Sequence, residues 1–74
     1  MAKLSAIEKP VFVVTDNQTI RIDLIDSVCR GYDTDNNQYW LRIEWNESQC
    51  PISYNTEVER DQDYSNLQTW INKL

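Results

Sequence analysis

The stretch Tyr39-Trp40-Leu41-Arg42-Ile43-Glu44-Trp45 decides the fold of this chain. Every second residue in it is aromatic or aliphatic: Tyr39, Leu41, Ile43 and Trp45. An apolar period of two is typical of a β-strand with one buried face. The intervening residues share the opposite face: Trp40, Arg42 and Glu44. We therefore expect the side chain of Trp40 to point away from the core.

Other strand-like stretches flank this one at residues 11–14, 19–24, 28–32 and 49–54. Polar clusters at residues 16–18, 33–38 and 46–48 predict the turns that join them into hairpins. In the second stretch, period-two alternation places three side chains on one face: Ile20, Ile22 and Leu24.

Two of these stretches, residues 28–32 and 49–54, each contain a residue with special backbone properties. Residues 28–32 either continue the strand before them past a bend at Asp26 and Ser27 or form a separate short strand, and Gly31 is the easiest place for a bulge. Pro51 lacks an amide hydrogen, which predicts an edge position for residues 49–54. The expected inner face of that strand is Cys50, Ile52 and Tyr54.

The period changes after residue 55, because the apolar residues then recur at helical spacing: Tyr64, Leu67, Trp70, Ile71 and Leu74. Thr56 and Glu59 match a capping box, while Asp61 offers a later N-cap and Val58 lies off the apolar stripe, which favours a helix start near Asp61. Acidic residues near the start with Lys73 near the end suit the helix dipole. The predicted fold is α+β, in which a C-terminal amphipathic helix covers one face of a single antiparallel sheet of four to five strands, arranged as two hairpins. We expect one domain over residues 1–74, with an N-terminal segment at 1–9, the sheet at 10–54 and the helix at 56–74.

Composition limits the functions open to so small a chain. Its 74 residues leave little room for both a core and an enclosed active site. With 12 acidic residues against 7 basic ones, the net charge is −5, and the basic residues are scattered, so we expect no direct nucleic-acid binding. No apolar run is long enough for a membrane span or a secretory signal, so we expect a cytoplasmic protein that binds no membrane.

No constellation of residues predicts catalysis or a cofactor. The chain has no His to activate a nucleophile or complete a zinc site. Cys29 and Cys50 are expected on inner strand faces as buried thiols, with a disulfide open only if their strands are neighbours. Residues 33–44 match part of a calcium-binding loop but carry Gln38 where the sharp turn requires Gly. We therefore expect no enzyme, no cofactor and no metal site.

The remaining candidates are surfaces for a protein partner. An outward Trp40 beside Arg42 has the composition of an interface hot spot, although Trp40 can equally cover the sheet by stacking on Arg42 or Arg21. A second candidate is the acidic start of the helix: Glu57, Glu59, Asp61 and Asp63. The favoured hypothesis is a small non-catalytic protein-binding module, of the kind found as bacterial or phage accessory or inhibitor proteins, with a homo-dimer also open. The alternative is an acidic DNA mimic that inhibits a nucleic-acid-handling enzyme, of the anti-restriction or anti-CRISPR type.

Overall fold

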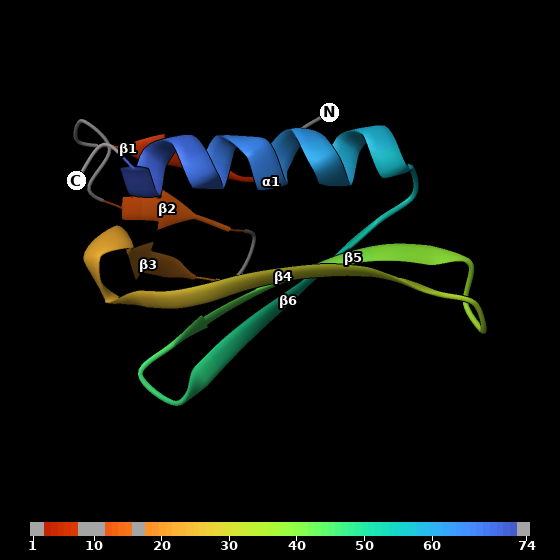
Figure 1. Cartoon of the computed structure of the whole chain (residues 1–74), viewed down its shortest axis with the longest axis horizontal. Helices are drawn as coiled ribbons and strands as arrows, with labels where there is room; N and C mark the ends of the chain where they lie inside the picture. The colour runs from red at the N-terminus through yellow and green to blue at the C-terminus, as the bar shows by residue number, and fades with distance from the viewer. Residues whose placement is uncertain (1–2, 8–11, 16–17, 73–74) are drawn as a thin grey trace.

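The computed structural model describes residues 3–7, 12–15 and 18–72 of the chain (Figure 1). In chain order these residues form β1 (Ser5–Ile7), β2 (Phe12–Val14), β3 (Thr19–Arg21), the 3-10 helix η1 (Ile22–Leu24), β4 (Ile25–Asp33), β5 (Gln38–Trp45), β6 (Ser48–Tyr54) and α1 (Glu57–Asn72). The predictions made for Val11, Asp16, Asn17, Lys73 and Leu74 lie outside the described residues. The expected α+β class, with antiparallel strands and a C-terminal helix, is confirmed.

The strands form two sheets, so the predicted single sheet of four to five strands is wrong. One sheet has the order β1-β2-β3 and the other the order β4-β5-β6, and every pairing is antiparallel. β1 lies inside the N-terminal segment for which the sequence predicted no element. Its residues carry no clear alternation, so only their pairing with β2 identifies them as a strand.

The division into two sheets arises at η1, where residues 19–24 depart from the predicted continuous strand. After β3 the chain makes a single 3-10 turn, closed by the Ile25 amide donating to the Ile22 carbonyl. A 3-10 turn repeats every three residues rather than every two. Ile20 and Ile22 therefore stay buried as predicted, whereas Leu24 is 45% exposed instead of facing the core.

The β4-β5-β6 sheet is built on the stretch that opened the sequence analysis. β5 is its central strand, and β4 is one continuous strand whose irregularity lies between Ile25 and Ser27. The bulge therefore sits at the predicted bend and not at Gly31, which pairs directly with Trp40. β6 is an edge strand, as Pro51 predicted.

α1 begins where the capping box predicted. The Thr56 hydroxyl oxygen accepts the Glu59 amide at 3.2 Å, and the hydroxyl donates to Glu59 Oε1 at 3.0 Å. The first bond satisfies a backbone amide that a helix terminus otherwise leaves without a partner, and the second holds the Thr56 hydroxyl in place. Val58 is 77% exposed, which agrees with its position off the apolar stripe, while Leu67 is fully buried.

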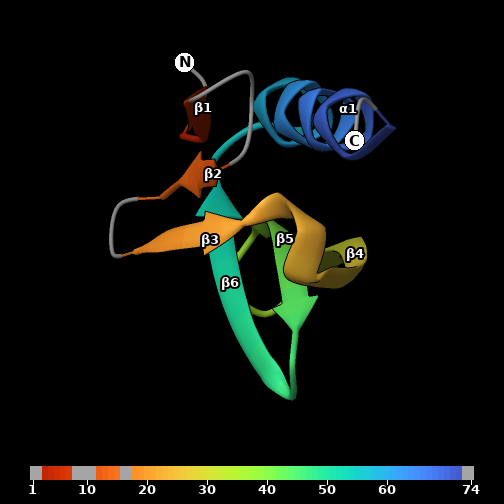
Figure 2. The ribbon, with the colours of Figure 1, turned by 90° about the vertical axis from the view of Figure 1, so that its left-hand side faces the viewer.

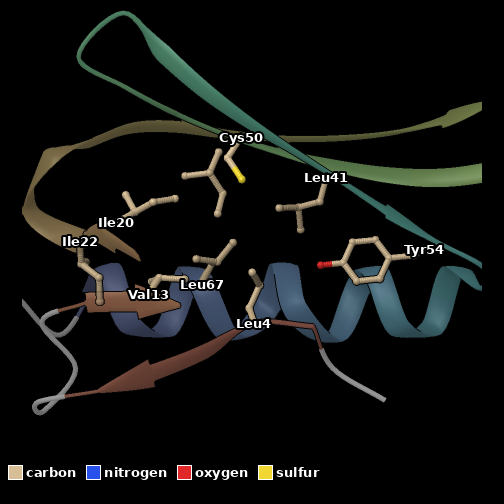
Figure 3. Close-up of a cluster of buried hydrophobic side chains, with 9 residues drawn as sticks. Leu4, Val13, Ile20, Ile22, Leu41, Cys50, Tyr54 and Leu67 are labelled. Carbon is tan, nitrogen blue, oxygen red and sulfur yellow. The ribbon is translucent and has the colours of Figure 1, made fainter. Parts of the chain in front are cut away.

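The core lies on one side of the β4-β5-β6 sheet. Side chains from both sheets, η1, α1 and the residue before β1 meet there, as Figure 3 shows: Leu4, Val13, Ile20, Ile22, Leu41, Ile43, Cys50, Tyr54 and Leu67. In Figures 1 and 2, α1 and the β1-β2-β3 sheet both lie on this side of the β4-β5-β6 sheet. No described element covers the opposite side, and we call that side the outer face.

Candidate functional site

The acidic start of α1 is largely engaged within the molecule. Asp61 Oδ1 accepts hydrogen bonds from Arg30 Nη1 at 3.0 Å and from Arg60 Nε and Nη2 at 3.0 and 2.9 Å. The Arg60 guanidinium is nearly buried and also donates to the Gly31 carbonyl at 2.9 Å. Asp61 therefore ties the helix to β4, and two cations offset its charge.

Asp63 was predicted as part of an exposed acidic surface, but its side chain is fully buried. Its Oδ2 accepts the Tyr54 hydroxyl at 2.7 Å and the Lys3 amide at 2.9 Å, while within the described residues Oδ1 accepts no hydrogen bond. Burial raises the pKa of Tyr54 well above its ordinary value, and the hydrogen bond to Asp63 raises it further. Asp63 lies four residues before Leu67, on the same helix face, which was the available signal that it points inward.

The other two acidic candidates have structural roles. Glu57 Oε2 lies 3.5 Å from Arg60 Nη2, and Glu59 belongs to the capping box. The six predicted site residues therefore do not form one surface. Trp40 and Arg42 lie together on the outer face, Glu57, Glu59 and Asp61 gather at the helix start, and Asp63 is in the core.

On the outer face, the Trp40 ring lies against Gly31 of β4. A Cβ added at Gly31 would lie only 2.3 Å from Trp40 Cζ2, so the ring occupies the space that a side chain at Gly31 would fill. The Arg42 guanidinium carbon lies 5.4 Å from the centroid of the Trp40 ring, within the range of a cation–π contact. Arg42 is thus the stacking partner, whereas Arg21 pairs with Asp23.

A row of ion pairs and hydrogen bonds continues along the outer face. Arg42 Nε lies 3.1 Å from Glu44 Oε2, close enough for an ion pair but without the alignment of a hydrogen bond. The other oxygen of Glu44 accepts the Ser27 hydroxyl at 2.6 Å. Glu44 therefore links the central strand to the bulged end of β4.

Beside that bulge is a hollow of about 460 Å³ that the sequence analysis did not identify. Its lining comes from the β4 bulge and the β5–β6 hairpin: Asp26, Ser27, Glu44, Trp45, Glu47, Ser48 and Gln49. Three of these residues are acidic and none is basic. In Figures 1 and 2 the β5–β6 turn projects away from α1. The sequence predicted a turn at residues 46–48, which the structure shortens to 46–47 because β6 begins at Ser48, but it did not predict the bulge that brings Asp26 to this turn.

The turn at one wall of the hollow has an unfavourable residue. Asn46 and Glu47 both have positive φ, 44° and 65°. Two-residue hairpins with this geometry favour Asn followed by Gly, because the left-handed conformation disfavours a side chain. The Asp26 carboxylate supports the turn by accepting the Asn46 amide at 3.0 Å.

A smaller hollow of about 130 Å³ lies beside the edge of β6. Its lining joins the start of the described chain to the edge strand: Lys3, Leu4, Thr15, Cys50, Pro51, Ile52 and Ser53. The Lys3 ammonium donates to the Ser53 carbonyl and lies 5.4 Å from the centroid of the Tyr54 ring. Lys3 therefore has internal partners at both its amide and its ammonium.

The cysteines are free and lie on opposite faces of the β4-β5-β6 sheet. Cys29 pairs with Arg42 on the outer face, which corrects its predicted inner position, and Cys50 pairs with Ile43 in the core. Their strands flank β5, so they are about 10 Å apart by strand spacing, beyond the span of a disulfide.

The partial calcium-loop match forms an ordinary turn. Asp33 accepts the Asp35 amide at 3.0 Å and the Asn36 side-chain amide at 2.8 Å, and the bond from Asn36 is the main cause that lowers the pKa of Asp33. In the described part of the chain, no three His, Cys, Asp or Glu side chains are arranged to hold a metal ion. No helix within residues 3–7, 12–15 and 18–72 is long and apolar enough to cross a bilayer.

Comparisons of the chain with protein-family models, with curated proteins and with solved structures give no match.

Proposed function

We propose that this chain is a small non-catalytic protein-binding module that uses the outer face of the β4-β5-β6 sheet to occupy a partner surface. The observation that supports this most directly is the position of Trp40. Its ring lies on a sheet face that no described element covers, between Gly31 and the Arg42 guanidinium. A large aromatic side chain that packs against a Gly on an uncovered sheet face can form the central contact with a partner.

The chemistry of this pair suits binding. Trp and Arg are the residue types most enriched among interface side chains whose truncation weakens binding strongly. Contacts with Gly31 and Arg42 already restrict the Trp40 ring, so association has less conformational entropy to remove. The same contacts leave Trp40 half-buried although no described element covers it.

The acidic alternative has less support. A DNA mimic needs rows of exposed carboxylates at phosphate-like spacing. At the start of α1, Asp63 is buried and Asp61 is shared by two arginines, so the helix presents fewer available charges than the sequence suggests. Electrostatic capture by Glu57 and Glu59 is therefore an outcome to test rather than the preferred proposal.

The test is capture of partners by immobilised protein from lysate of the native host, measured by quantitative mass spectrometry. Trp40→Ala and Arg42→Ala should each reduce recovery of the specific partner. A hot-spot contribution of about 2 kcal/mol corresponds to roughly 30-fold weaker binding for Trp40→Ala. Tyr32→Ala is the matched control, because Tyr32 is a 44% exposed aromatic on the other face of the same sheet.

The competing outcomes are distinct. If Glu57→Gln with Glu59→Gln abolishes capture while Trp40→Ala leaves it intact, the electrostatic alternative replaces the proposal. If recovery of the partner is unchanged both in Trp40→Ala and in the variant that combines Glu57→Gln with Glu59→Gln, the outer face is not the binding surface. In a separate measurement, sedimentation velocity of the wild type and of Trp40→Ala determines whether the captured partner is a second copy of the chain.

A further inference from the structure

We infer that the partner inserts a Lys or Arg side chain into the hollow between the β4 bulge and the β5–β6 turn. This inference rests on the proposed function and names the chemistry of its partner. The hollow lies at one end of the outer face, where Glu44 joins it to Arg42 and Trp40. Its volume of about 460 Å³ falls in the usual range of ligand pockets, about 300–1,000 Å³.

The carboxylate oxygens in the hollow differ in whether they already have a hydrogen-bond or ion-pair partner. Both Glu44 oxygens have partners, one in Ser27 and one in Arg42. Asp26 uses Oδ2 for the Asn46 amide, and within the described residues neither its Oδ1 nor the Glu47 carboxylate has a hydrogen bond or an ion pair. Asp26 and Glu47 therefore provide the negative charge of the hollow that is not already paired.

The shape and charge of the hollow favour an extended organic cation. The three carboxylates have no basic residue beside them in the lining, but their arrangement does not hold a metal ion. The methylene stem of a Lys or Arg side chain can lie along the wall of the hollow while its charged end reaches Asp26 and Glu47. The net charge of −5 also steers a basic partner toward the chain.

The distance along β5 sets the spacing on the partner. Trp40 and Glu44 lie on the same face, four residues apart, which is about 13 Å at the rise of a strand. A partner segment that covers Trp40 with an apolar side chain would thus place its basic side chain about four extended residues away. This requirement separates a specific partner from a merely basic one.

The turn provides a variant that removes charge without weakening the fold. Glu47 has a φ of 65°, a conformation that Gly adopts more easily. Glu47→Gly should therefore raise the melting temperature or leave it unchanged while it removes one carboxylate of the hollow. Loss of binding in this variant cannot be attributed to unfolding.

The probe is an acetylated, amidated tetra-lysine peptide, titrated at low ionic strength into the ¹⁵N-labelled full chain and followed by two-dimensional NMR. An acetylated tetra-glutamine peptide is the uncharged control. We expect the amide shifts to concentrate at residues 26–27 and 44–49. Asp26→Asn and Glu47→Gly should each raise the dissociation constant about three- to fivefold, as single exposed charge pairs do. Asp35→Asn, which removes an exposed carboxylate at the opposite end of the β4–β5 hairpin, should leave it unchanged.

Two results would overturn the inference: shifts spread evenly over all acidic residues, or a loss in Asp35→Asn equal to that in Glu47→Gly. Either would mean general charge attraction without a site. Failure of the proposed function is read separately. If Trp40→Ala reduces partner capture but tetra-lysine does not bind the hollow, the outer face binds a partner of other chemistry. If tetra-lysine binds the hollow while capture is insensitive to Trp40, the proposed function is wrong.

Discussion

Replacing Tyr54 by Phe removes one hydroxyl from the most buried polar contact of the fold. That hydroxyl donates to Asp63 Oδ2 at 2.7 Å, and both side chains are fully buried. A hydrogen bond to a charged group contributes about 1.5–3 kcal/mol to stability. In Tyr54→Phe the Asp63 carboxylate keeps only the Lys3 amide as a donor within the described residues, because Oδ1 already accepts no hydrogen bond. We therefore expect a loss at the upper end, about 2–3 kcal/mol.

The loss expected for Tyr54→Phe is large relative to the total free energy of unfolding. A core of this size supplies only about 3–5 kcal/mol, so Tyr54→Phe should retain a small part of the free energy of unfolding. Urea unfolding at pH 7, followed by Trp fluorescence, measures it. Asp63→Asn and the double variant complete a cycle whose interaction energy should exceed about 1 kcal/mol, because the residues share one buried bond. A loss below about 0.5 kcal/mol for Tyr54→Phe, or additivity of the two substitutions, would refute this account of the contact.

The same contact has a pH dependence with a definite sign. Burial, followed by the bond to Asp63, raises the pKa of Tyr54 above its ordinary value of 10.0. The contribution of Tyr54 is therefore fully present below pH 10 and is lost as the pH rises above it, because the unfolded chain then gives up the proton more readily. Wild-type stability should fall more steeply above pH 10 than that of Tyr54→Phe. If the stability of the two proteins falls with the same slope above pH 10, the Tyr54 hydroxyl is not held by Asp63 in this way.

Three further predictions concern the core, the outer face and the turn. Leu67→Ala should lose about 2–5 kcal/mol as core truncations do, whereas the exposed Val58→Ala should stay within about 0.5 kcal/mol of wild type; equal melting temperatures for the two would place Leu67 outside the core. Gly31→Ala should lose about 1–3 kcal/mol by overpacking against Trp40, about 4–8 °C per kcal/mol in a domain of this size. Adding Trp40→Ala should recover part of that loss. If the double variant recovers none of the lost stability, the loss does not arise from contact between residue 31 and Trp40. The pKa of Asp33 should lie below its ordinary value of 3.8, chiefly because of the bond from Asn36, so its contribution is present above pH 3.8 and is lost as the pH falls through the lowered pKa. In an NMR titration Asn36→Ala should move the midpoint upward, and an unmoved midpoint would exclude Asn36 as the cause.

Local patterns predicted local structure well in this chain. The alternation in residues 39–45 gave the central strand and both its faces, and Thr56 with Glu59 gave the first turn of α1. These features depend on neighbours within a few residues. The division into two sheets depends instead on one 3-10 turn at residues 22–24, whose apolar residues Ile22 and Leu24 fit a strand and a turn equally well. Hydrophobic period alone cannot distinguish the two.

The candidate site was predicted in part for the same reason. The outward position of Trp40 and its contact with Arg42 follow from residues two apart on one strand. The burial of Asp63 depends on Tyr54 and on the Lys3 amide, and the hollow depends on a bulge that brings Asp26 to the β5–β6 turn. Such contacts join residues distant in sequence, and charge composition alone assigns their carboxylates to the surface.

The bond from the Lys3 amide to Asp63 has a consequence for how the protein is made. Its two residues are 60 positions apart, so the ribosome adds Asp63 as the 60th residue after Lys3. At about 5–20 residues per second, the N-terminal segment waits roughly 3–12 seconds. Hairpins form in about 1–10 microseconds, so the sheets can assemble long before α1 exists to cover them. During that interval the apolar faces of the nascent chain are open, and chaperones that bind exposed hydrophobic segments have their opportunity before synthesis reaches α1.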